Sequence, residues 1–301
     1  MKIRAWLNAA RLRTLPLSLS GVIMGTAIAN FYGYSDILIF ILALLTTIAF
    51  QVISNFANDY GDGMKGTDND DRIGPKRALQ SGLLSPLELK RGIALTAFIS
   101  VVLVIVLVYR AFGTEHLVLP LVFLILGGLS IWAAIRYTVG KSAYGYQGFG
   151  DLFVFLFFGL LAVIGSFFLY TKQLRFTPVL PAIAIGALSA GVLNLNNLRD
   201  YRSDKKANKH TLVVKIGFSN GKRYHYALLV MAFVAVLVFV GTFAKTVVNS
   251  LPLLAFVPIA YHFWTVLNIK EPVAMDPELK KLALSTFLLA VLTYITYNKF
   301  L

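Results

Sequence analysis

Nine long apolar runs constrain the fold of this chain more than any other feature of its sequence. Each run is about 18–22 residues long, which is the length a helix needs to cross a hydrocarbon core of roughly 30 Å. Because every backbone amide must find its partner locally inside a bilayer, each run should form a helix. The pattern predicts an all-α fold, a multi-pass transmembrane helix bundle with about nine spans around a central cavity capped by loops. The runs are centred on Leu15–Asn30, Ile37–Phe56, Ile93–Val108, Leu117–Ala134, Leu152–Tyr170, Val179–Leu195, Tyr226–Phe243, Leu251–Leu267 and Leu282–Tyr297.

The overall composition excludes most other classes of protein. Hydrophobic residues make up 57% of the 301 residues and charged residues only 14%, whereas about 25% of the residues in soluble domains are charged. That balance rules out a soluble globule, a disordered chain and a fibrous repeat. The chain has no cysteine, so disulfides, thiol nucleophiles and thiolate metal sites are excluded as well. The first run has no small-residue cleavage site, so we expect it to be retained rather than removed as a signal peptide.

The net charge of +14 is divided unevenly between the two sides of the predicted bundle. When nine spans alternate, 23 of the 28 Lys and Arg residues fall on the side of the amino terminus and 5 on the other. Basic residues accumulate on the cytoplasmic side of membrane proteins, so the excess reflects topology in a lipid bilayer rather than a nucleic-acid partner. We expect a protein of the cytoplasmic (inner) membrane with a cytoplasmic amino terminus and an outer carboxy terminus. An even number of spans would break the alternation, most easily at the last pair.

Two long loops on the predicted cytoplasmic side, Asn58–Arg91 and Arg199–Arg223, hold eight of the 14 acidic residues. Each loop begins where an Asn-bearing helix end runs into the dipeptide Asp-Tyr, at Asp59 and at Asp200. Four spans separate the two segments, which suggests an internal duplication. We therefore expect both loops to meet over one cavity, within a single integral-membrane domain over residues 1–301.

The acidic residues of these loops are spaced for joint binding of a cation. Asp59 and Asp62 are three residues apart, and Asp200 and Asp204 are four apart, so each pair shares a face if its helix continues. Clustered carboxylate and amide oxygens suit Mg²⁺, whose coordination a substrate's phosphates and water complete. Lys and Arg side chains lie between these acids, as a Mg²⁺-bound diphosphate on a lipid tail requires.

The alternative is that these charges are ordinary solvated loop residues. The positive-inside rule explains the Lys and Arg residues but not carboxylates at two matching span ends, so the four aspartates favour a metal site. Asp68 lies beside Gly66 and Asn69, where local turn formation explains an aspartate equally well. The four histidines are scattered and show no metal-ligand spacing.

A third polar stretch, residues 136–151, joins the fourth and fifth predicted spans on the same side. Arg136 and Lys141 are candidates to contact an anionic substrate, and Tyr137 and Tyr144 are candidates to face a developing carbocation. The opposing interpretation is an interfacial belt of tyrosines around a glycine turn. The sequence alone leaves both interpretations open.

The residues that carry a family resemblance lie in these three stretches. They are Asn58-Asp59-Tyr60-Gly61-Asp62 with Lys65-Gly66-Thr67-Asp68 and Asp71-Arg72-Ile73-Gly74-Pro75, then Asn196-Asn197-Leu198-Arg199-Asp200 through Asp204, and Arg136-Tyr137 with Gly148-Phe149-Gly150-Asp151. This set resembles the two aspartate-rich motifs of the UbiA superfamily of intramembrane prenyltransferases. Its details are most similar to the branch that prenylates 1,4-dihydroxy-2-naphthoate in menaquinone synthesis. Gly66 stands where the superfamily often has Asp, and Asn197 where some relatives have an acid.

The resemblance implies a Mg²⁺-dependent prenyltransferase that joins a polyprenyl diphosphate to 1,4-dihydroxy-2-naphthoate, with loss of CO₂ and diphosphate. The metal-binding candidates are Asn58, Asp59, Asp62, Asp68, Asn197, Asp200 and Asp204. The candidates for substrate contact and catalysis are Lys65, Arg72, Lys76, Arg77, Arg136, Tyr137, Lys141, Tyr144 and Arg202. Of these, Lys65, Lys76, Arg77 and Arg202 are expected to neutralise the leaving diphosphate.

Two alternatives remain open at this point. One is a different aromatic acceptor on the same scaffold, such as 4-hydroxybenzoate, haem or a chlorin. The other is a membrane transporter, since intramembrane carboxylates also mark ion pathways. A transporter should distribute its acids through both halves of the membrane, whereas 12 of the 14 acids here lie on the predicted cytoplasmic side. That asymmetry favours an enzyme with a site on one side.

Overall fold

The computed structural model describes residues 2–68, 73–114 and 117–298, and among them it contains helices and loops but no strand. Within these residues nine segments are long and apolar enough to cross a membrane. The prediction of an all-α bundle with nine spans is therefore confirmed for the described chain, which is a multi-pass membrane protein. The spans are Lys2–Phe31, Ile37–Met64, Pro86–Phe112, Val118–Arg136, Gly150–Thr171, Val179–Arg199, Phe218–Phe243, Val247–Asn268 and Pro272–Tyr297.

Several spans are built from more than one helix. A left-handed residue, Arg11, with φ of 49°, separates the first two helices. The middle of the fifth span, η3, is a π-helix between two short α-helices. The helices are α1 (Lys2–Ala10), η1 (Leu12–Thr14), α2 (Leu15–Phe31), α3 (Ile37–Met64), α4 (Pro86–Phe112), α5 (Val118–Arg136), η2 (Tyr144–Gln147), α6 (Gly150–Val154), η3 (Phe155–Gly165), α7 (Ser166–Thr171), α8 (Val179–Arg199), α9 (Tyr201–Lys206), α10 (Leu212–Ile216), α11 (Phe218–Phe243), η4 (Val247–Ala255), α12 (Phe256–Asn268), η5 (Pro272–Met275) and α13 (Asp276–Tyr297).

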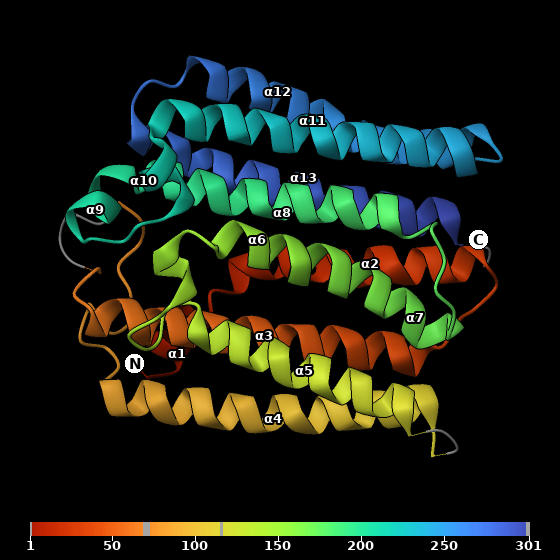
Figure 1. The fold of residues 1–301 in the computed structure, drawn as a ribbon, viewed down its shortest axis with the longest axis horizontal. Coiled ribbons are helices and arrows are strands. Elements are labelled where there is room, and N and C mark those ends of the chain that lie inside the picture. Colours follow the sequence, from red (N-terminus) through yellow and green to blue (C-terminus); the bar gives the residue numbers. More distant parts are fainter. Residues whose placement is uncertain (1, 69–72, 115–116, 299–301) are drawn as a thin grey trace.

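The long helices run nearly parallel to the longest axis of the molecule (Figure 1). The amino terminus and the short helices α9 and α10 lie at one end, which we call the motif end because Asp62 and Asp204 lie there. The carboxy terminus lies at the opposite end, which we call the far end. Termini at opposite ends are what an odd number of spans requires.

Local sequence signals explain where the helices begin. Asp36 caps α3 by accepting hydrogen bonds from the backbone amides of Leu38 and Ile39. Ser85 and Glu88 form a capping box at the start of α4, in which each side chain accepts the other residue's backbone amide. These caps satisfy amides that would otherwise lack partners at the ends of spans.

Glycines allow the fifth span to lie close to its two neighbours. A Cβ atom on Gly25 of α2 would lie 2.3 Å from the carbonyl oxygen of Val163 in η3. On the other side of η3, a Cβ atom on Gly159 would lie 2.6 Å from the Cα atom of Gly186 in α8. Small residues that permit such backbone contact are typical of helix packing in membranes. The fifth span is thereby fixed between α2 and α8.

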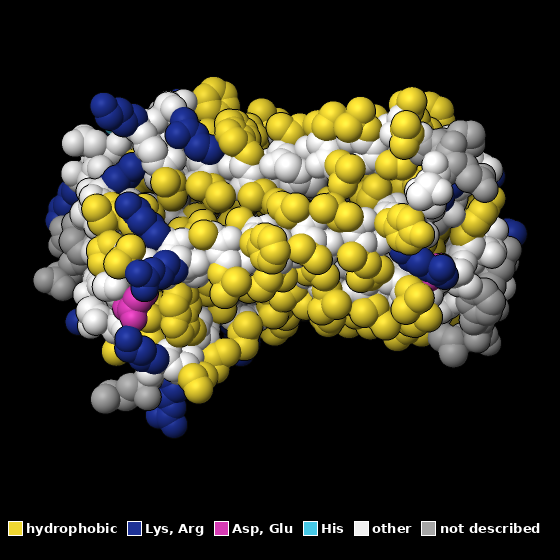
Figure 2. Space-filling view, turned by 90° about the horizontal axis from the view of Figure 1, so that it is seen from below, with side chains coloured by type: hydrophobic (Ala, Val, Ile, Leu, Met, Phe, Trp, Pro, Cys, Tyr) yellow, Lys and Arg dark blue, Asp and Glu magenta, His cyan; other side chains and the backbone are white. Residues whose placement is uncertain are grey.

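The surface has the pattern of a membrane-embedded bundle. Hydrophobic side chains cover the middle of the face in Figure 2, and Lys and Arg side chains lie toward its ends, most of them at the left end. Large apolar side chains are exposed on the spans themselves, among them Phe98 of α4 at 67% and Trp264 of α12 at 66%. Exposure of such side chains is favourable only against lipid, which agrees with the nine spans.

Candidate functional site

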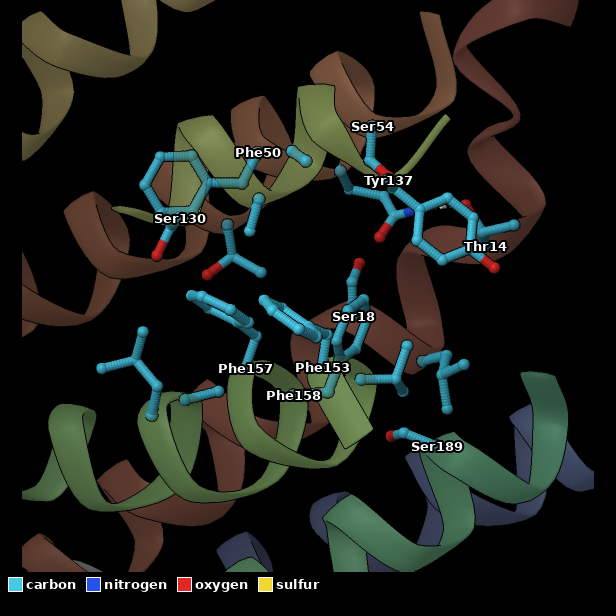
Figure 3. A pocket seen from close by; sticks show the side chains of 18 of the residues that line it. Thr14, Ser18, Phe50, Ser54, Ser130, Tyr137, Phe153, Phe157, Phe158 and Ser189 are labelled. Atoms are coloured by element: carbon cyan, nitrogen blue, oxygen red, sulfur yellow. Dashed lines mark hydrogen bonds between the residues drawn. The ribbon is translucent and has the colours of Figure 1, made fainter. Parts of the chain in front are cut away.

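The main cavity of the bundle has a volume of about 410 Å³ and extends from the motif end toward the far end. Its lining comes mainly from the first six spans, with Leu279 of α13 and a few loop residues, and is mostly apolar. Phe153, Phe157 and Phe158 point into it from α6 and η3, opposite Phe50 and Ser130 (Figure 3). Its charged lining residues, Arg11, Asp62, Arg77 and Lys209, all lie toward the motif end. The cavity therefore joins a charged site to an apolar channel.

The two acidic motifs meet at the mouth of this cavity. Asp62 is on the last turns of α3, and Asp204 is on α9, and both are at least 95% buried. The ammonium group of Lys209 lies 3.8 Å from Oδ2 of Asp62 and 3.9 Å from Oδ1 of Asp204. The expectation that both loops meet over one cavity is confirmed by these contacts. One basic side chain, 12% exposed, occupies the space between the two carboxylates.

A tyrosine from the third polar stretch completes this cluster. The hydroxyl of Tyr146 donates a hydrogen bond to Oδ1 of Asp62 at 2.7 Å and lies 2.7 Å from the hydroxyl of Thr67. The ammonium of Lys65 lies 3.8 Å from the centre of the Tyr146 ring, and that of Lys209 lies 5.2 Å from it. Two segments far apart in sequence, one bearing Tyr146 and the other Lys209, thus contact the carboxylate of Asp62.

Burial and neighbouring charges shift the pKa values of these groups in opposite ways. Burial raises the pKa of Asp204 to about 7, and the carboxylates of Asp200 and Asp62 add to the rise, which Lys209 opposes. Burial alone would lower the pKa of Lys209, but the carboxylates of Asp62 and Asp204 outweigh it and hold that pKa above its ordinary value. Lys209 therefore stays charged, as a counter-ion for acids removed from water.

Asp59 contacts the loop that follows its helix. Its two carboxylate oxygens accept the backbone amides of Ala78 at 3.1 Å and Leu79 at 3.3 Å. Because α3 continues through both aspartates of the first motif, the condition for them to share one face of the helix is met. A second cavity of about 230 Å³ lies beside Asp59, and its lining includes the basic residues Arg11 and Arg77, which also line the main cavity.

The second motif departs from the expected geometry at Asp200. A continuous helix would place Asp200 and Asp204 on one face, but α8 ends at Arg199 and Asp200 links it to α9. The backbone amide of Asp204 still bonds to the carbonyl of Asp200 at 2.8 Å, so one helical turn survives across the break. The guanidinium of Arg199 binds both carboxylate oxygens of Asp200, at 2.8 and 2.6 Å, and also Asp276 at the start of α13.

Aromatic side chains form the wall next to the charged cluster. Tyr137 and Tyr144 both line the cavity, with their rings edge to face at 5.4 Å. The Tyr144 ring stacks on Phe153 at 4.0 Å, and its hydroxyl donates to the carbonyl of Ala133. Burial, and after it the carboxylate of Asp151, raise the pKa of Tyr137. Both tyrosines are thus neutral aromatic surfaces held in fixed orientations.

The remaining predicted residues lie in several different places. Asn58 lines the cavity and accepts a hydrogen bond from Thr138, and Asn197 is buried at the end of α8. Arg77 lines both cavities, with its Nε 3.6 Å from a carboxylate oxygen of Asp68. Arg72 lies outside the described residues.

Four predicted basic residues are placed at or near the surface. Lys76 is exposed and lines the smaller cavity, and Lys141 is exposed in the loop after α5. Arg136 donates a hydrogen bond to Ser142 within its own loop. Arg202 forms an ion pair with Glu271 at 3.0 Å, in which both side chains are about two thirds exposed. None of the four lines the main cavity as the structure describes it.

The oxygen atoms at the motif end fit Mg²⁺. No three acidic or histidine side chains among the described residues lie close enough together to hold a metal ion by themselves. Oδ2 of Asp204 is buried and has no hydrogen-bond partner in the described chain. Carboxylate and amide oxygens are the ligands that Mg²⁺ prefers, and it commonly takes one or two carboxylates with phosphate oxygens supplying the rest. Asp62 and Asp204 match that arrangement.

Sequence reasoning missed several residues of this site. Lys209 was given no role of its own among the basic residues of the second loop, and Tyr146 was given none among the tyrosines of the third stretch. A buried chain of polar groups was missed as well. His225 and His262 face each other with Nε2 atoms 2.9 Å apart, and Nδ1 of His262 lies 2.7 Å from Glu278. The partners are on α11, α12 and α13, too far apart in sequence for any spacing pattern.

Comparisons with known proteins give a consistent result. The model of the UbiA prenyltransferase family matches residues 18–276. The chain is 44% identical to the 1,4-dihydroxy-2-naphthoate octaprenyltransferase of Escherichia coli, over 97% of this chain and 95% of that protein. It is 42% identical to the enzyme of the same name from Haemophilus influenzae, over 97% and 94%. Among solved structures, a UbiA homolog from Archaeoglobus fulgidus bound to DMAPP and Mg²⁺ is similar, with a TM-score of 0.61 and 15% identity over 98% of this chain and 99% of that one.

Proposed function

The chain belongs to the UbiA prenyltransferase family, and we propose that it transfers a polyprenyl group from polyprenyl diphosphate to 1,4-dihydroxy-2-naphthoate. The products are CO₂, diphosphate and demethylmenaquinol, the reduced form of demethylmenaquinone, which places the reaction in menaquinone biosynthesis. The single observation that carries this assignment is the 44% identity to the Escherichia coli octaprenyltransferase along almost the whole of both chains. The cavity supports it, because one space joins a charged mouth to an apolar channel.

The diphosphate binds at the motif end in this proposal. Asp62 and Asp204 are the first ligands for Mg²⁺, and the buried, unpartnered Oδ2 of Asp204 is the oxygen most available to it. Amide and carboxylate oxygens nearby complete the proposed set, which is Asn58, Asp59, Asp68, Asn197 and Asp200. When bound, Mg²⁺ supplies positive charge that neutralises the diphosphate and makes it a better leaving group.

Basic side chains share in this neutralisation. Lys209 already lies between two carboxylates at the mouth, and Arg77 reaches both cavities from the first loop. The exposed Lys65 is held against the ring of Tyr146. These three cations can contact diphosphate oxygens as the bond from the allylic carbon to oxygen breaks and the electron pair leaves with the diphosphate.

The apolar part of the cavity protects the allylic cation that results. The faces of Tyr137 and Tyr144 stabilise positive charge through their π-electrons, and a wall of Phe side chains excludes water. The naphthoate ring carbon that bears the carboxylate then attacks the allylic carbon and forms the new carbon–carbon bond. Loss of that carboxylate as CO₂ returns its electron pair to the ring and restores aromaticity.

The same proposal sets the orientation of the chain. It acts as one integral-membrane prenyltransferase domain over residues 1–301 in the cytoplasmic (inner) membrane, with the motif end in the cytoplasm. The distribution of basic residues supports this orientation, because 23 of 28 lie on the side of the amino terminus when the spans alternate.

The test is a product assay with the purified full chain. The protein is incubated with a prenyl diphosphate, Mg²⁺ and 1,4-dihydroxy-2-naphthoate, and the lipid product is identified by mass spectrometry. Parallel reactions replace the acceptor with 4-hydroxybenzoate or replace Mg²⁺ with EDTA. We expect prenylated, decarboxylated naphthoquinol only with the naphthoate and Mg²⁺. Transfer to 4-hydroxybenzoate alone would overturn the acceptor, and solute flux in liposomes without any product would favour a transporter.

A further inference from the structure

The cavity has a length that its lining residues define. Asp62 on α3 belongs to the charged mouth; below it the lining on α3 extends from Asn58 to Ala43, and on α5 it extends from Tyr137, at the end of the helix, to Phe123. At about 1.5 Å per residue, each of these two stretches is roughly 22 Å long. Both helices thus give nearly the same depth for the apolar part of the cavity, from the inner side of the charged mouth to a level near the far end.

A cluster of three aromatic rings closes the cavity at that level. Phe123 lines the cavity from α5. Its ring packs against Phe112 of α4 at 5.1 Å between centroids and against Phe168 of α7 at 5.7 Å, in a nearly parallel stack with the latter. Beyond them, the ammonium of Lys172 lies 4.4 Å from the centre of the Phe112 ring. Phe123 cannot turn away from the cavity without losing two ring contacts, so it is a fixed end wall.

The length of the cavity corresponds to a definite number of isoprene units. One unit contributes four carbon–carbon bonds of about 1.5 Å, or roughly 5 Å when extended in a zigzag. The stretch between the mouth and Phe123 therefore accommodates about four units. The relatives are octaprenyltransferases by name, so a tail of eight units would not fit in extended form.

We propose that Phe123 is a specificity-determining residue that ends the tail site after about four isoprene units, and that units beyond the fourth lie outside the cavity. This inference rests on the proposed function. The surplus tail leaves between α5 and η3, because α5 packs mainly on α3 and α4, η3 packs mainly on α2 and α8, and the cavity separates the two. Outside it meets lipid, which is as apolar as the protein interior, so additional units neither strengthen nor weaken binding.

The experiment measures kcat/KM for prenyl diphosphates of two, three, four and eight units at equal mole fraction in the same detergent micelles. For the wild-type chain we expect kcat/KM to rise up to four units and then to stay level within about twofold. Phe123→Trp enlarges the end wall, so it should lower kcat/KM at least fivefold for four and eight units relative to two units. Ala43→Leu places a larger side chain at the same depth of the cavity, from α3, and should produce the same dependence of kcat/KM on donor length.

The controls separate a local effect from a general one. Phe98→Trp is the matched substitution on the lipid-facing surface of α4, where Phe98 is 67% exposed, and it should leave the length profile unchanged. A steady rise of wild-type kcat/KM from four to eight units would overturn the inference, as would equal losses at all lengths in both cavity variants. Transfer to the naphthoate without any dependence on length defeats this inference alone, whereas the absence of transfer with every donor defeats the proposed function.

Discussion

Lys209 offers the most direct test of the charged mouth. Its ammonium lies 3.8 Å from Asp62 and 3.9 Å from Asp204, one carboxylate from each motif. Replacement with Met keeps most of the length of the side chain but removes the charge, so the two buried carboxylates lose the cation that both of them contact. The consequence should depend on whether another cation is available to replace it.

The geometry gives the size of the effect. Opposite charges about 4 Å apart attract by about 4 kcal/mol at an effective dielectric constant of 20, and only 12% of the Lys209 side chain is exposed to screening. Removal of one partner from a buried ion pair typically costs about 3–5 kcal/mol. We therefore expect Lys209→Met to reduce the stability of the metal-free protein by about 3 kcal/mol.

Mg²⁺ should rescue this loss if it binds where we propose. A divalent cation between Asp62 and Asp204 supplies the missing charge, so the difference in thermal midpoint between variant and wild type should be several degrees in EDTA and should shrink at saturating Mg²⁺. Activity should still fall by about 10²–10³-fold, because an ammonium group near the leaving diphosphate is lost. Stability is measured by thermal unfolding in detergent, and activity by product formation.

The matched control is Lys205→Met, in the same loop, where the side chain is exposed. That variant should resemble wild type in EDTA and in Mg²⁺, because surface charges contribute little. If Lys209→Met lost the same stability in EDTA and in Mg²⁺, the ion would not bind between Asp62 and Asp204, and the reasoning would fail.

Three further predictions concern other parts of the molecule. Tyr146→Phe removes the hydroxyl that bonds Asp62 at 2.7 Å. Since hydrogen bonds to charged groups contribute about 1.5–3 kcal/mol, initial rates should give a kcat/KM about tenfold or more below wild type. An unchanged kcat/KM would exclude Tyr146 from the site. Gly25→Ala would place a Cβ atom 2.3 Å from a carbonyl oxygen, so the thermal midpoint should fall by the equivalent of about 1–3 kcal/mol, while Gly128→Ala, with no atom within 4 Å, should leave it unchanged. Glu278→Ala removes the buried acceptor of His262 and Lys281 and should lower the free energy of unfolding by about 3–5 kcal/mol. Replacement of the exposed Lys280 with Ala should change it very little. Similar thermal midpoints for the two variants would show that the buried chain does not stabilise the bundle.

The spans could be predicted because a bilayer leaves the backbone few choices. A run of about 20 apolar residues must satisfy its own amides, so its length alone indicates a helix. The length of a run does not predict the backbone conformation inside the span. It does not reveal the left-handed Arg11 between α1 and α2, nor the π-helix of Phe155–Gly165, because both depend on how neighbouring helices pack.

The candidate site could be predicted in part, for a different physical reason. Carboxylates at span ends are costly and need an explanation, so Asp62 and Asp204 stood out from the sequence. Their contacts did not, because Lys209 and Tyr146 approach them from other segments of the chain. The sequence likewise predicted the same role for Arg202 and Arg77, although of the two only Arg77 lines the cavities. Arg202 forms an ion pair with Glu271 at the surface.

The two aspartates of each motif have different surroundings, which the repeated sequence alone does not show. The first aspartate of each motif is bound by groups of the chain itself: Asp59 by the backbone amides of Ala78 and Leu79, and Asp200 by Arg199. The second aspartate of each motif, Asp62 or Asp204, faces Lys209 across the mouth of the cavity. The contacts of the two aspartates therefore differ in the same way in both motifs. One carboxylate fixes the loop or helix end that bears the motif, and the other is left to face the positive charge of the site.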